Sequence, residues 1–200
     1  LIFAKEVLSK NKGTVIISDV KASDVLFKQI KKLKGKPLMW KTGHSLIKSK
    51  MKETNSKLAG EMSGHIFFAD KYYGYDDALY AAVRLLNIVS KNKNLKGMLS
   101  EFNKRISTPE IHINCEDSKK FQIMKLCEKN AKSKYSNINF IDGLRVTTKK
   151  GWWLLRASNT QPALIARCEA IDKKSLVQFL EDIKNLLKKA DISVNLKNLF

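Results

Sequence analysis

The chain has 200 residues, of which 44% are hydrophobic, enough for one large domain or two of about 100 residues each. Lysine and arginine number 38 against 19 acidic residues, which gives a formal net charge of +19. The excess is scattered lysine without an Arg-Gly repeat or an aromatic-interleaved basic strip, so we expect an anionic substrate and no nucleic-acid partner. No apolar run approaches the roughly 20 residues of a membrane helix, and the three cysteines lack metal-binding spacing. These features predict reduced thiols, no membrane partner and a cytoplasmic location.

The first half of the chain alternates short apolar runs with helical patterns. Strands are expected at residues 14–18, 37–40, 58–59 and 65–68, and helices at 24–33, about 45–53 and 76–90. Ser23 and Ser45 are expected to cap the first two helices. The buried face of the third helix is expected to carry Leu79, Val83, Leu86 and Val89. This order predicts a three-layer α/β domain with a mostly parallel mixed sheet over residues 1–104.

The periodicity lapses between Phe102 and Pro109, which we interpret as a domain boundary. Beyond it, strands are expected at residues 110–114, 137–141, 144–148, 151–156 and 164–170, and helices at about 118–130 and 173–189. Ser118 is expected to cap the first of these helices. The turns at Asp142-Gly143 and Lys150-Gly151 suit hairpins. The second half, residues 105–200, is therefore predicted to be an α+β domain with an antiparallel sheet packed by helices.

The segment RASNTQP, at 156–162, lies between two predicted strands and carries groups that suit a phosphate. Arg156 offers forked donors that match phosphate oxygens bidentately, and Ser158, Asn159 and Thr160 add neutral donors. Serine, asparagine, threonine and proline also form ordinary turns. From the residues alone, a phosphate loop and a plain turn both remain open.

The segment GEMSGH, at 60–65, places a carboxylate, a hydroxyl and an imidazole among glycines. Glu61 can accept from two adjacent sugar hydroxyls, Ser63 can donate or accept, and His65 can transfer a proton near neutral pH. The alternative is a glycine-rich turn with a solvated Glu61. Together the two segments predict a protein that binds a phosphosugar, with one loop on the phosphate and the other on the ring hydroxyls.

Three further side chains are candidates for ligand contact. Lys21 follows a predicted strand, where α/β domains place ligand groups, and His44 stands where a helix begins, which favours anions. Arg167, in a predicted strand, is either a second phosphate contact or part of a structural ion pair. Asp76 and Asp77 open a helix and are better explained as caps than as metal ligands, and no metal site is expected in this chain.

These segments together resemble one family, the α-D-phosphohexomutases, and within it the bacterial phosphomannomutase/phosphoglucomutase branch. The resemblance rests on DVKAS (19–23), PLMWKTGHSLIKSKM (37–51), LAGEMSGHIFF (58–68), DDALYAAVRLL (76–86), STPEI (107–111), DGLRV (142–146) and RASNTQPALIARCEA (156–170). Family members have four domains, and this chain resembles the third and fourth. The phosphoserine loop and the Mg²⁺-binding loop of the first two domains are missing here.

The resemblance implies a carbohydrate-metabolism isomerase that interconverts hexose 1-phosphate and 6-phosphate through a phosphoserine and a bisphosphorylated intermediate. It implies that Glu61 and Ser63 read the sugar hydroxyls, that His65 is a proton-transfer group and that Lys21 and His44 line the cleft. It further implies that the non-transferred phosphate of the substrate is bound by Arg156, Ser158, Asn159 and Thr160. We expect Mg²⁺ to be bound by the missing N-terminal domains and the 200-residue chain alone to be inactive. Alternatives are the phosphoglucosamine mutase branch and a non-catalytic basic binding module.

Overall fold

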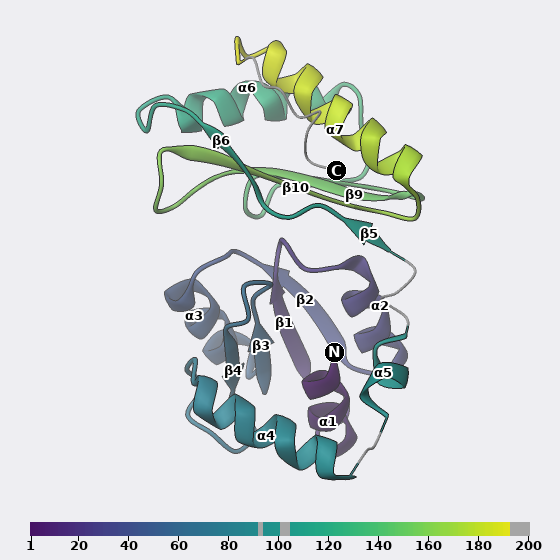
Figure 1. Ribbon diagram of the computed structural model, residues 1–200. Helices are drawn as coiled ribbons and strands as arrows, with labels where there is room; N and C mark the ends of the chain where they lie inside the picture. Colours follow the sequence, from purple (N-terminus) through teal and green to yellow (C-terminus); the bar gives the residue numbers. More distant parts are fainter. Residues whose placement is uncertain (92–93, 101–104, 193–200) are drawn as a thin grey trace. The chain divides into compact units, whose positions relative to one another are not determined.

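The computed structural model describes residues 1–91, 94–100 and 105–192. The chain forms two compact units, Leu1–Asn103 and Lys104–Phe200, which Figure 1 shows in purple to teal and in teal through green to yellow. Residues 102–104 of the predicted boundary lie outside the described part of the chain. Each unit is described below by itself.

The first unit is built on a four-stranded mixed sheet (Figure 1). In spatial order its strands are β2 (Lys36–Trp40), β1 (Val15–Asp19), β3 (Leu58–Gly60) and β4 (Ile66–Phe68). β1 pairs in parallel with β2 and β3, whereas β4 runs antiparallel to β3. The mostly parallel mixed sheet predicted for this half is confirmed.

Helices cover both faces of this sheet. They are α1 (Ile2–Lys10), α2 (Asp24–Lys32), α3 (His44–Thr54) and α4 (Ala78–Lys91), and a short helix, α5 (Leu95–Met98), follows α4 in the chain. Because side chains alternate along a strand, Ile16 packs with residues of α1 and α2, and its neighbour Ile17 packs against Ile47 and Met51 of α3. The result is the expected three-layer α/β arrangement, with α1 and α5 as helices that the sequence analysis missed.

Two of the expected helix caps have different outcomes. Ser23 caps α2 as predicted, and its side chain accepts from the Val25 N–H at 3.1 Å. The prediction for Ser45 is wrong, because α3 begins one residue earlier, after Gly43, and has no side-chain cap. Gly43 has φ of 132°, a backbone conformation that favours glycine.

The predicted buried face of α4 is wrong. Leu79, Val83 and Leu86 are 81%, 65% and 68% exposed, whereas Arg84 and Ile88 are buried. Apolar residues occur on both sides of this helix, so hydrophobic periodicity alone does not select the inner one. The inward face is fixed by Arg84, a charged residue that the pattern assigns to solvent.

Alanine substitutions on the two sides of α4 are expected to differ sharply in their effect on stability. Ile88→Ala removes a side chain that is 5% exposed and should lower the free energy of unfolding by about 2–4 kcal/mol. Leu86→Ala should change it by less than about 0.5 kcal/mol, as for most surface substitutions. Urea unfolding of both variants checks this. Equal losses in the free energy of unfolding would contradict the observed orientation of α4 and support the face predicted from the sequence.

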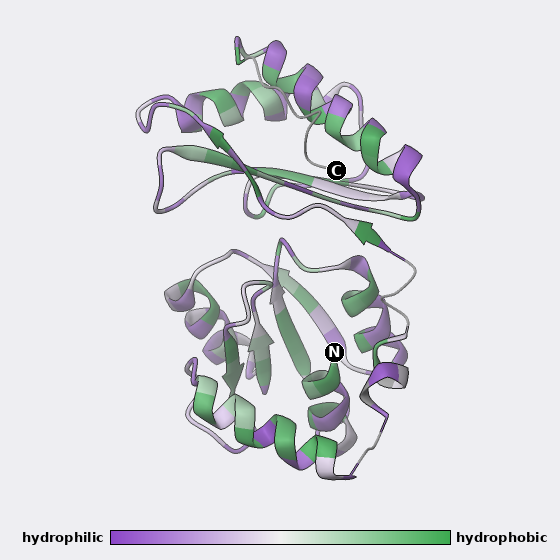
Figure 2. Cartoon of the chain, viewed as in Figure 1, coloured by the Kyte–Doolittle hydropathy of each residue, from purple (hydrophilic) through white to green (hydrophobic). Residues whose placement is uncertain are grey.

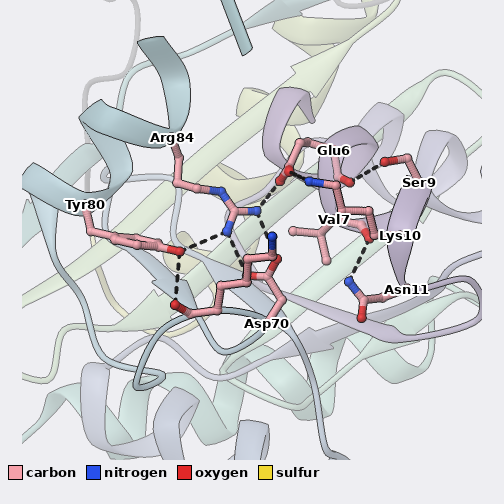
Figure 3. A network of polar contacts seen from close by, with 9 residues as sticks. Glu6, Val7, Ser9, Lys10, Asn11, Asp70, Tyr80 and Arg84 are labelled. Carbon is pink, nitrogen blue, oxygen red and sulfur yellow. Dashed lines mark hydrogen bonds and ion pairs between the residues drawn. The ribbon is translucent and has the colours of Figure 1, made fainter. Parts of the chain in front are cut away.

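Arg84 is the centre of a polar network that joins three segments of the first unit (Figure 3). Its guanidinium donates to both carboxylate oxygens of Asp70 at 2.9 and 3.0 Å, to Glu6 of α1 and to the Tyr80 hydroxyl. It also lies 4.5 Å from the ring centroid of Phe68. Burial by itself disfavours the charged Glu6 carboxylate, but hydrogen bonds from Lys10 and Arg84 hold the pKa of that group below its usual value.

Replacing Arg84 with methionine is expected to destabilise the first unit by about 3–5 kcal/mol, because the change leaves the buried Asp70 carboxylate without its cation and leaves Glu6 with Lys10 alone. The folded-state pKa of Glu6 lies below its unfolded value. This contribution is therefore present above the unfolded pKa and disappears as the pH falls through the folded one. Urea unfolding should be measured at pH 7 and near pH 3. The difference in free energy of unfolding between Arg84→Met and the unchanged chain should be smaller at the acid pH. A gap independent of pH would contradict this account.

The second unit is a fully antiparallel sheet with helices on one face (Figure 1). Its strands are β5 (Ile106–Ser107), β6 (Ile111–Asn114), β7 (Ile138–Asn139), β8 (Leu144–Thr148), β9 (Gly151–Ala157) and β10 (Ala163–Ala170). The order is β5-β10-β9-β8-β7, and β6 also pairs with β10. The helices are α6 (Lys120–Lys132) and α7 (Lys173–Lys188). The predicted α+β class is confirmed, and β5 was not predicted.

Every second residue of β9 and β10 faces the helices and belongs to the core of this unit. Trp153, Leu155, Leu164 and Cys168 pack in one cluster with buried residues of α6 and α7, and Figure 2 shows the hydrophobic colouring of these strands. Ser118 does not cap α6, because that helix begins after Lys119 without a side-chain cap.

The three cysteines are free thiols as expected, and burial raises the pKa of Cys127 to about 11. Within the part of the chain that the structure covers, no helix has the length and apolarity to cross a bilayer.

Candidate functional site

Parallel pairing brings the ends of three strands of the first unit to one edge of the sheet. Asp19, the last residue of β1, is paired with Trp40 at the end of β2, and Ser18 is paired with Gly60 at the end of β3. The segments that leave these strands carry the predicted residues Lys21, His44 and Glu61–His65. Ligands of open α/β sheets bind beyond the carboxyl ends of the strands, so this edge is the candidate site.

Glu61 is held in place by its neighbours although its side chain is nearly buried, at 9% exposure. Its Oε1 atom accepts from the backbone N–H of Gly43 at 2.8 Å, and its Oε2 atom accepts from Ser63 Oγ at 3.2 Å. The alternative of a solvated Glu61 is therefore wrong. A carboxylate fixed by two donors retains free lone pairs that can accept from ligand hydroxyls.

His65 is oriented by an aspartate that the sequence analysis assigned to another role. Its Nδ1 atom lies 2.7 Å from Asp76 Oδ2, and the other oxygen of Asp76 accepts from the Ile66 N–H at 3.0 Å. The expectation that Asp76 caps α4 is thus wrong, whereas Asp77 does cap it, since its Oδ1 accepts from the Tyr80 N–H at 2.8 Å. The carboxylate leaves Nε2 of His65 as the ring atom available to a ligand.

Lys21 is 6% exposed and lies beside an aspartate that is completely buried. Its Nζ atom is 3.7 Å from Asp19 Oδ2, and the other oxygen of Asp19 accepts from the Met62 N–H at 3.2 Å. Asp19 therefore ties the lysine to the 60–65 turn. The signal for Asp19 in the sequence was its place at the end of a buried strand.

Two histidines and Glu61 form the group in the described residues that has the geometry to hold a metal ion. One ligand atom from each of His44, Glu61 and His65 lies within 4.8 Å of the other two, and the two imidazole rings are 4.4 Å apart between centroids. Mg²⁺ requires oxygen ligands in octahedral geometry, so this set does not fit the Mg²⁺ that the resemblance implies. The expectation that this chain has no metal site took no account of this group.

The phosphate candidate Arg156 lies in β9 of the second unit and is 5% exposed. Its guanidinium donates through Nη2 to Asp142 Oδ1 at 3.2 Å, and its Nε lies 3.1 Å from Asp142 Oδ2. Asp142 thereby fixes the plane of the guanidinium and leaves its second edge for another partner. The sequence pattern identifies Asp142 only as a turn residue.

The loop that joins β9 to β10 is stabilised from within by Ser158. Its buried hydroxyl accepts from the N–H groups of Thr160 and Gln161 at 3.3 and 3.1 Å. The side chain of Lys120 donates to the Gln161 carbonyl at 3.2 Å, which ties this loop to the start of α6. The exposed side chains of Asn159 and Thr160 are the groups that this arrangement leaves to a ligand.

Arg167 shares a face of the sheet with Arg156. Ile165 is the register partner of Arg156, and Arg167 follows two residues later, so its side chain leaves the same face. Leu154, the partner of Arg167, is also the partner of Arg145. The face opposite the helices therefore carries three arginines, of which Arg145 is buried against the Trp152 ring at 3.8 Å, together with the carboxylate of Glu169.

Gly143 is required for the close approach of the 142–143 turn to Arg156. It has φ of 86°, and a Cβ atom there would lie 2.6 Å from both Arg156 Cβ and Leu155 O. Gly143→Ala should therefore cost more stability than Gly13→Ala, a matched control with φ of 75° and no atom within 4 Å of the added Cβ. Both carry the cost of positive φ, about 1 kcal/mol or more, so urea unfolding of the pair isolates the contact with Arg156. Equal losses would show that this contact is unimportant.

Comparison with known proteins assigns both units to the same family. Residues 1–106 match the family model "Phosphoglucomutase/phosphomannomutase, alpha/beta/alpha domain III", and residues 110–186 match the model of the C-terminal domain of the same family. The phosphomannomutase/phosphoglucomutase of Pseudomonas aeruginosa is 46% identical over 97% of this chain and 42% of its own length. The phosphoglucomutase of Neisseria gonorrhoeae is 43% identical over 91% of this chain and 40% of its own length.

Solved structures show the same similarity. A phosphoglucomutase/phosphomannomutase family protein from Burkholderia thailandensis superposes with a TM-score of 0.87 at 41% identity, covering 97% of this chain and 41% of that protein. An N-acetylphosphoglucosamine mutase from Aspergillus fumigatus, solved with GlcNAc-6P and magnesium, has a TM-score of 0.63 at 13% identity, covering 96% of this chain and 41% of that one, and shares the fold. The chain belongs to the phosphoglucomutase/phosphomannomutase family. It spans about two fifths of the length of the curated relatives it matches.

Proposed function

We propose that this chain supplies the sugar-hydroxyl and phosphate recognition of a phosphosugar mutase that interconverts hexose 1-phosphate and 6-phosphate. The observation that carries the proposal is the buried Arg156 guanidinium, which is oriented by Asp142 beside the 158–162 loop. A planar guanidinium with one edge paired presents its remaining donors in the fork that matches phosphate oxygens. Residues 105–200 thus form the phosphate-binding domain and residues 1–104 the sugar-binding domain.

In the phosphate-binding domain, Arg156 takes the charge of the non-transferred phosphate, and Asn159 and Thr160 add neutral donors. Ser158 contributes its hydroxyl proton while it holds the loop closed through its oxygen. Because these residues recognise the phosphate group and not the carbon that carries it, they accept the substrate with this phosphate at either C1 or C6. We assign Arg167 a supporting charge on the same face.

In the sugar-binding domain, Glu61 accepts from ring hydroxyls, and Ser63 adds a donor or acceptor beside it. His65 exchanges a proton with a sugar hydroxyl through Nε2, and Asp76 stabilises the imidazolium form that results, as a carboxylate does for a catalytic histidine. Lys21 and His44 complete the lining of this edge.

The transferred phosphoryl group and Mg²⁺ come, in this proposal, from N-terminal domains of the full-length protein, as a phosphoserine and its metal loop. Mg²⁺ neutralises charge on the phosphoryl oxygens when it is bound. The 200-residue chain then binds phosphosugar but does not turn it over. We also infer a cytoplasmic location, which the free thiols support.

A binding titration of the 200-residue chain with glucose 1-phosphate tests this proposal. Arg156→Lys keeps the positive charge but removes the paired N–H donors of the guanidinium. Because a charge-assisted hydrogen bond contributes about 1.5–3 kcal/mol, the Kd for glucose 1-phosphate should rise at least about tenfold. Lys129→Ala, which removes an exposed positive charge from the same domain, is the control and should leave the Kd unchanged. Equal effects of the two changes would contradict the proposal, as would turnover by the isolated chain.

Two alternatives make different predictions in the same experiments. A basic binding module predicts salt-sensitive affinity for duplex DNA that exceeds the affinity for glucose 1-phosphate. A phosphoglucosamine mutase predicts that the full-length enzyme prefers glucosamine phosphate over mannose and glucose phosphates. The names of the relatives that are 43–46% identical favour mannose or glucose phosphate.

A further inference from the structure

We propose that His44, Glu61 and His65 form a binding site for a transition-metal ion, with Zn²⁺ as the preferred ion. This site is separate from any Mg²⁺ site of the full-length protein. The three ligand atoms lie within 4.8 Å of one another. Two imidazole nitrogens and one carboxylate oxygen are a donor set that Zn²⁺ binds with a fourth position open. Such a set disfavours Mg²⁺ and Ca²⁺, which prefer oxygen ligands.

The surroundings of the group are those of a prepared metal site. The 2.7 Å contact between His65 Nδ1 and Asp76 Oδ2 places a carboxylate behind the histidine. A carboxylate in that position fixes the tautomer and leaves the Nε2 lone pair for a metal ion. Glu61 is likewise fixed by Gly43 and Ser63, so two of the three ligands are already held in position.

The remaining adjustment falls on His44, the ligand that is most free to move. Ligand atoms of a tetrahedral zinc site with bonds of about 2.0–2.1 Å are about 3.4 Å apart, so no pair of ligand atoms in the group needs to approach by more than about 1.4 Å. His44 is exposed and occupies the first position of α3. Rotation about its side-chain bonds can bring its ring nitrogen closer without moving the strands that carry the rest of the site.

The proposal has a functional consequence that rests on the proposed mutase function. Glu61 and His65 are the groups assigned to sugar hydroxyls and proton transfer, so an ion bound to them occupies their free atoms. Zn²⁺ should therefore inhibit the full-length enzyme in competition with phosphosugar, and excess Mg²⁺ should not relieve the inhibition.

The test measures metal binding by the isolated chain, without phosphosugar and without turnover. Calorimetry with Zn²⁺ should show one saturable site, and Co²⁺ in its place should give a visible d–d absorption band. His65→Gln and His44→Gln should each weaken Zn²⁺ binding at least tenfold. Asp76→Asn, which keeps all three ligands, should weaken it about 10–100-fold, the usual effect of losing a supporting carboxylate.

The chain provides matched controls. It has three histidines, and the third, His112, is exposed on β6, so His112→Gln should leave the affinity unchanged. Cys115→Ser tests the half-buried thiol as a competing ligand and should also have no effect. The imidazole NMR signals of His44 and His65 should shift with Zn²⁺ while that of His112 stays in place, which detects binding even if one variant folds poorly.

Absence of saturable Zn²⁺ binding would overturn the proposal, as would equal affinity of the His65→Gln and His112→Gln chains or loss of binding in Cys115→Ser. These outcomes leave the mutase proposal unaffected, because that proposal depends on phosphosugar binding and Arg156. Conversely, if the chain binds Zn²⁺ through His44, Glu61 and His65 but binds no phosphosugar, only the mutase proposal is contradicted.

Discussion

The parallel pairing of β1 with β2 and β3 is the constraint on which the first unit's site depends. It brings the carboxyl ends of three strands to one edge, with Asp19 opposite Trp40 and Ser18 opposite Gly60. Segments that are more than 20 residues apart in the chain then exchange hydrogen bonds, as from Met62 to Asp19. Without this register, the residues of the site would have no common neighbourhood.

A second theme is that the polar side chains of both candidate sites are oriented by partners from other segments. Asp142 holds Arg156 in the second unit, and Asp76 holds His65 in the first. A side chain that is fixed before the ligand arrives loses less conformational freedom on binding. For Arg156, which is nearly buried, the carboxylate partner also offsets the cost of desolvating the charge.

The site edge of the first unit presents donors suited to two kinds of ligand. Carboxylate and hydroxyl oxygens suit sugar hydroxyls, whereas a pair of imidazoles beside a carboxylate suits a transition metal. The same geometry that would let His65 exchange protons, a free Nε2 backed by Asp76, also makes it a good metal ligand. Proton transfer and metal binding would therefore exclude each other at this position.

The sequence by itself determined the class of both halves, most strand and helix positions and the segments that carry the candidate side chains, because local periodicity and turn residues act over a few neighbours. Only the tertiary structure decided that Arg84 points inward while Leu86 points outward, since the ion partners Glu6 and Asp70 lie far away in sequence. It also decided that Asp76 serves His65 rather than its own helix, and that His44 meets Glu61. Such pairings depend on strand register and on contacts between distant segments, which no local pattern encodes.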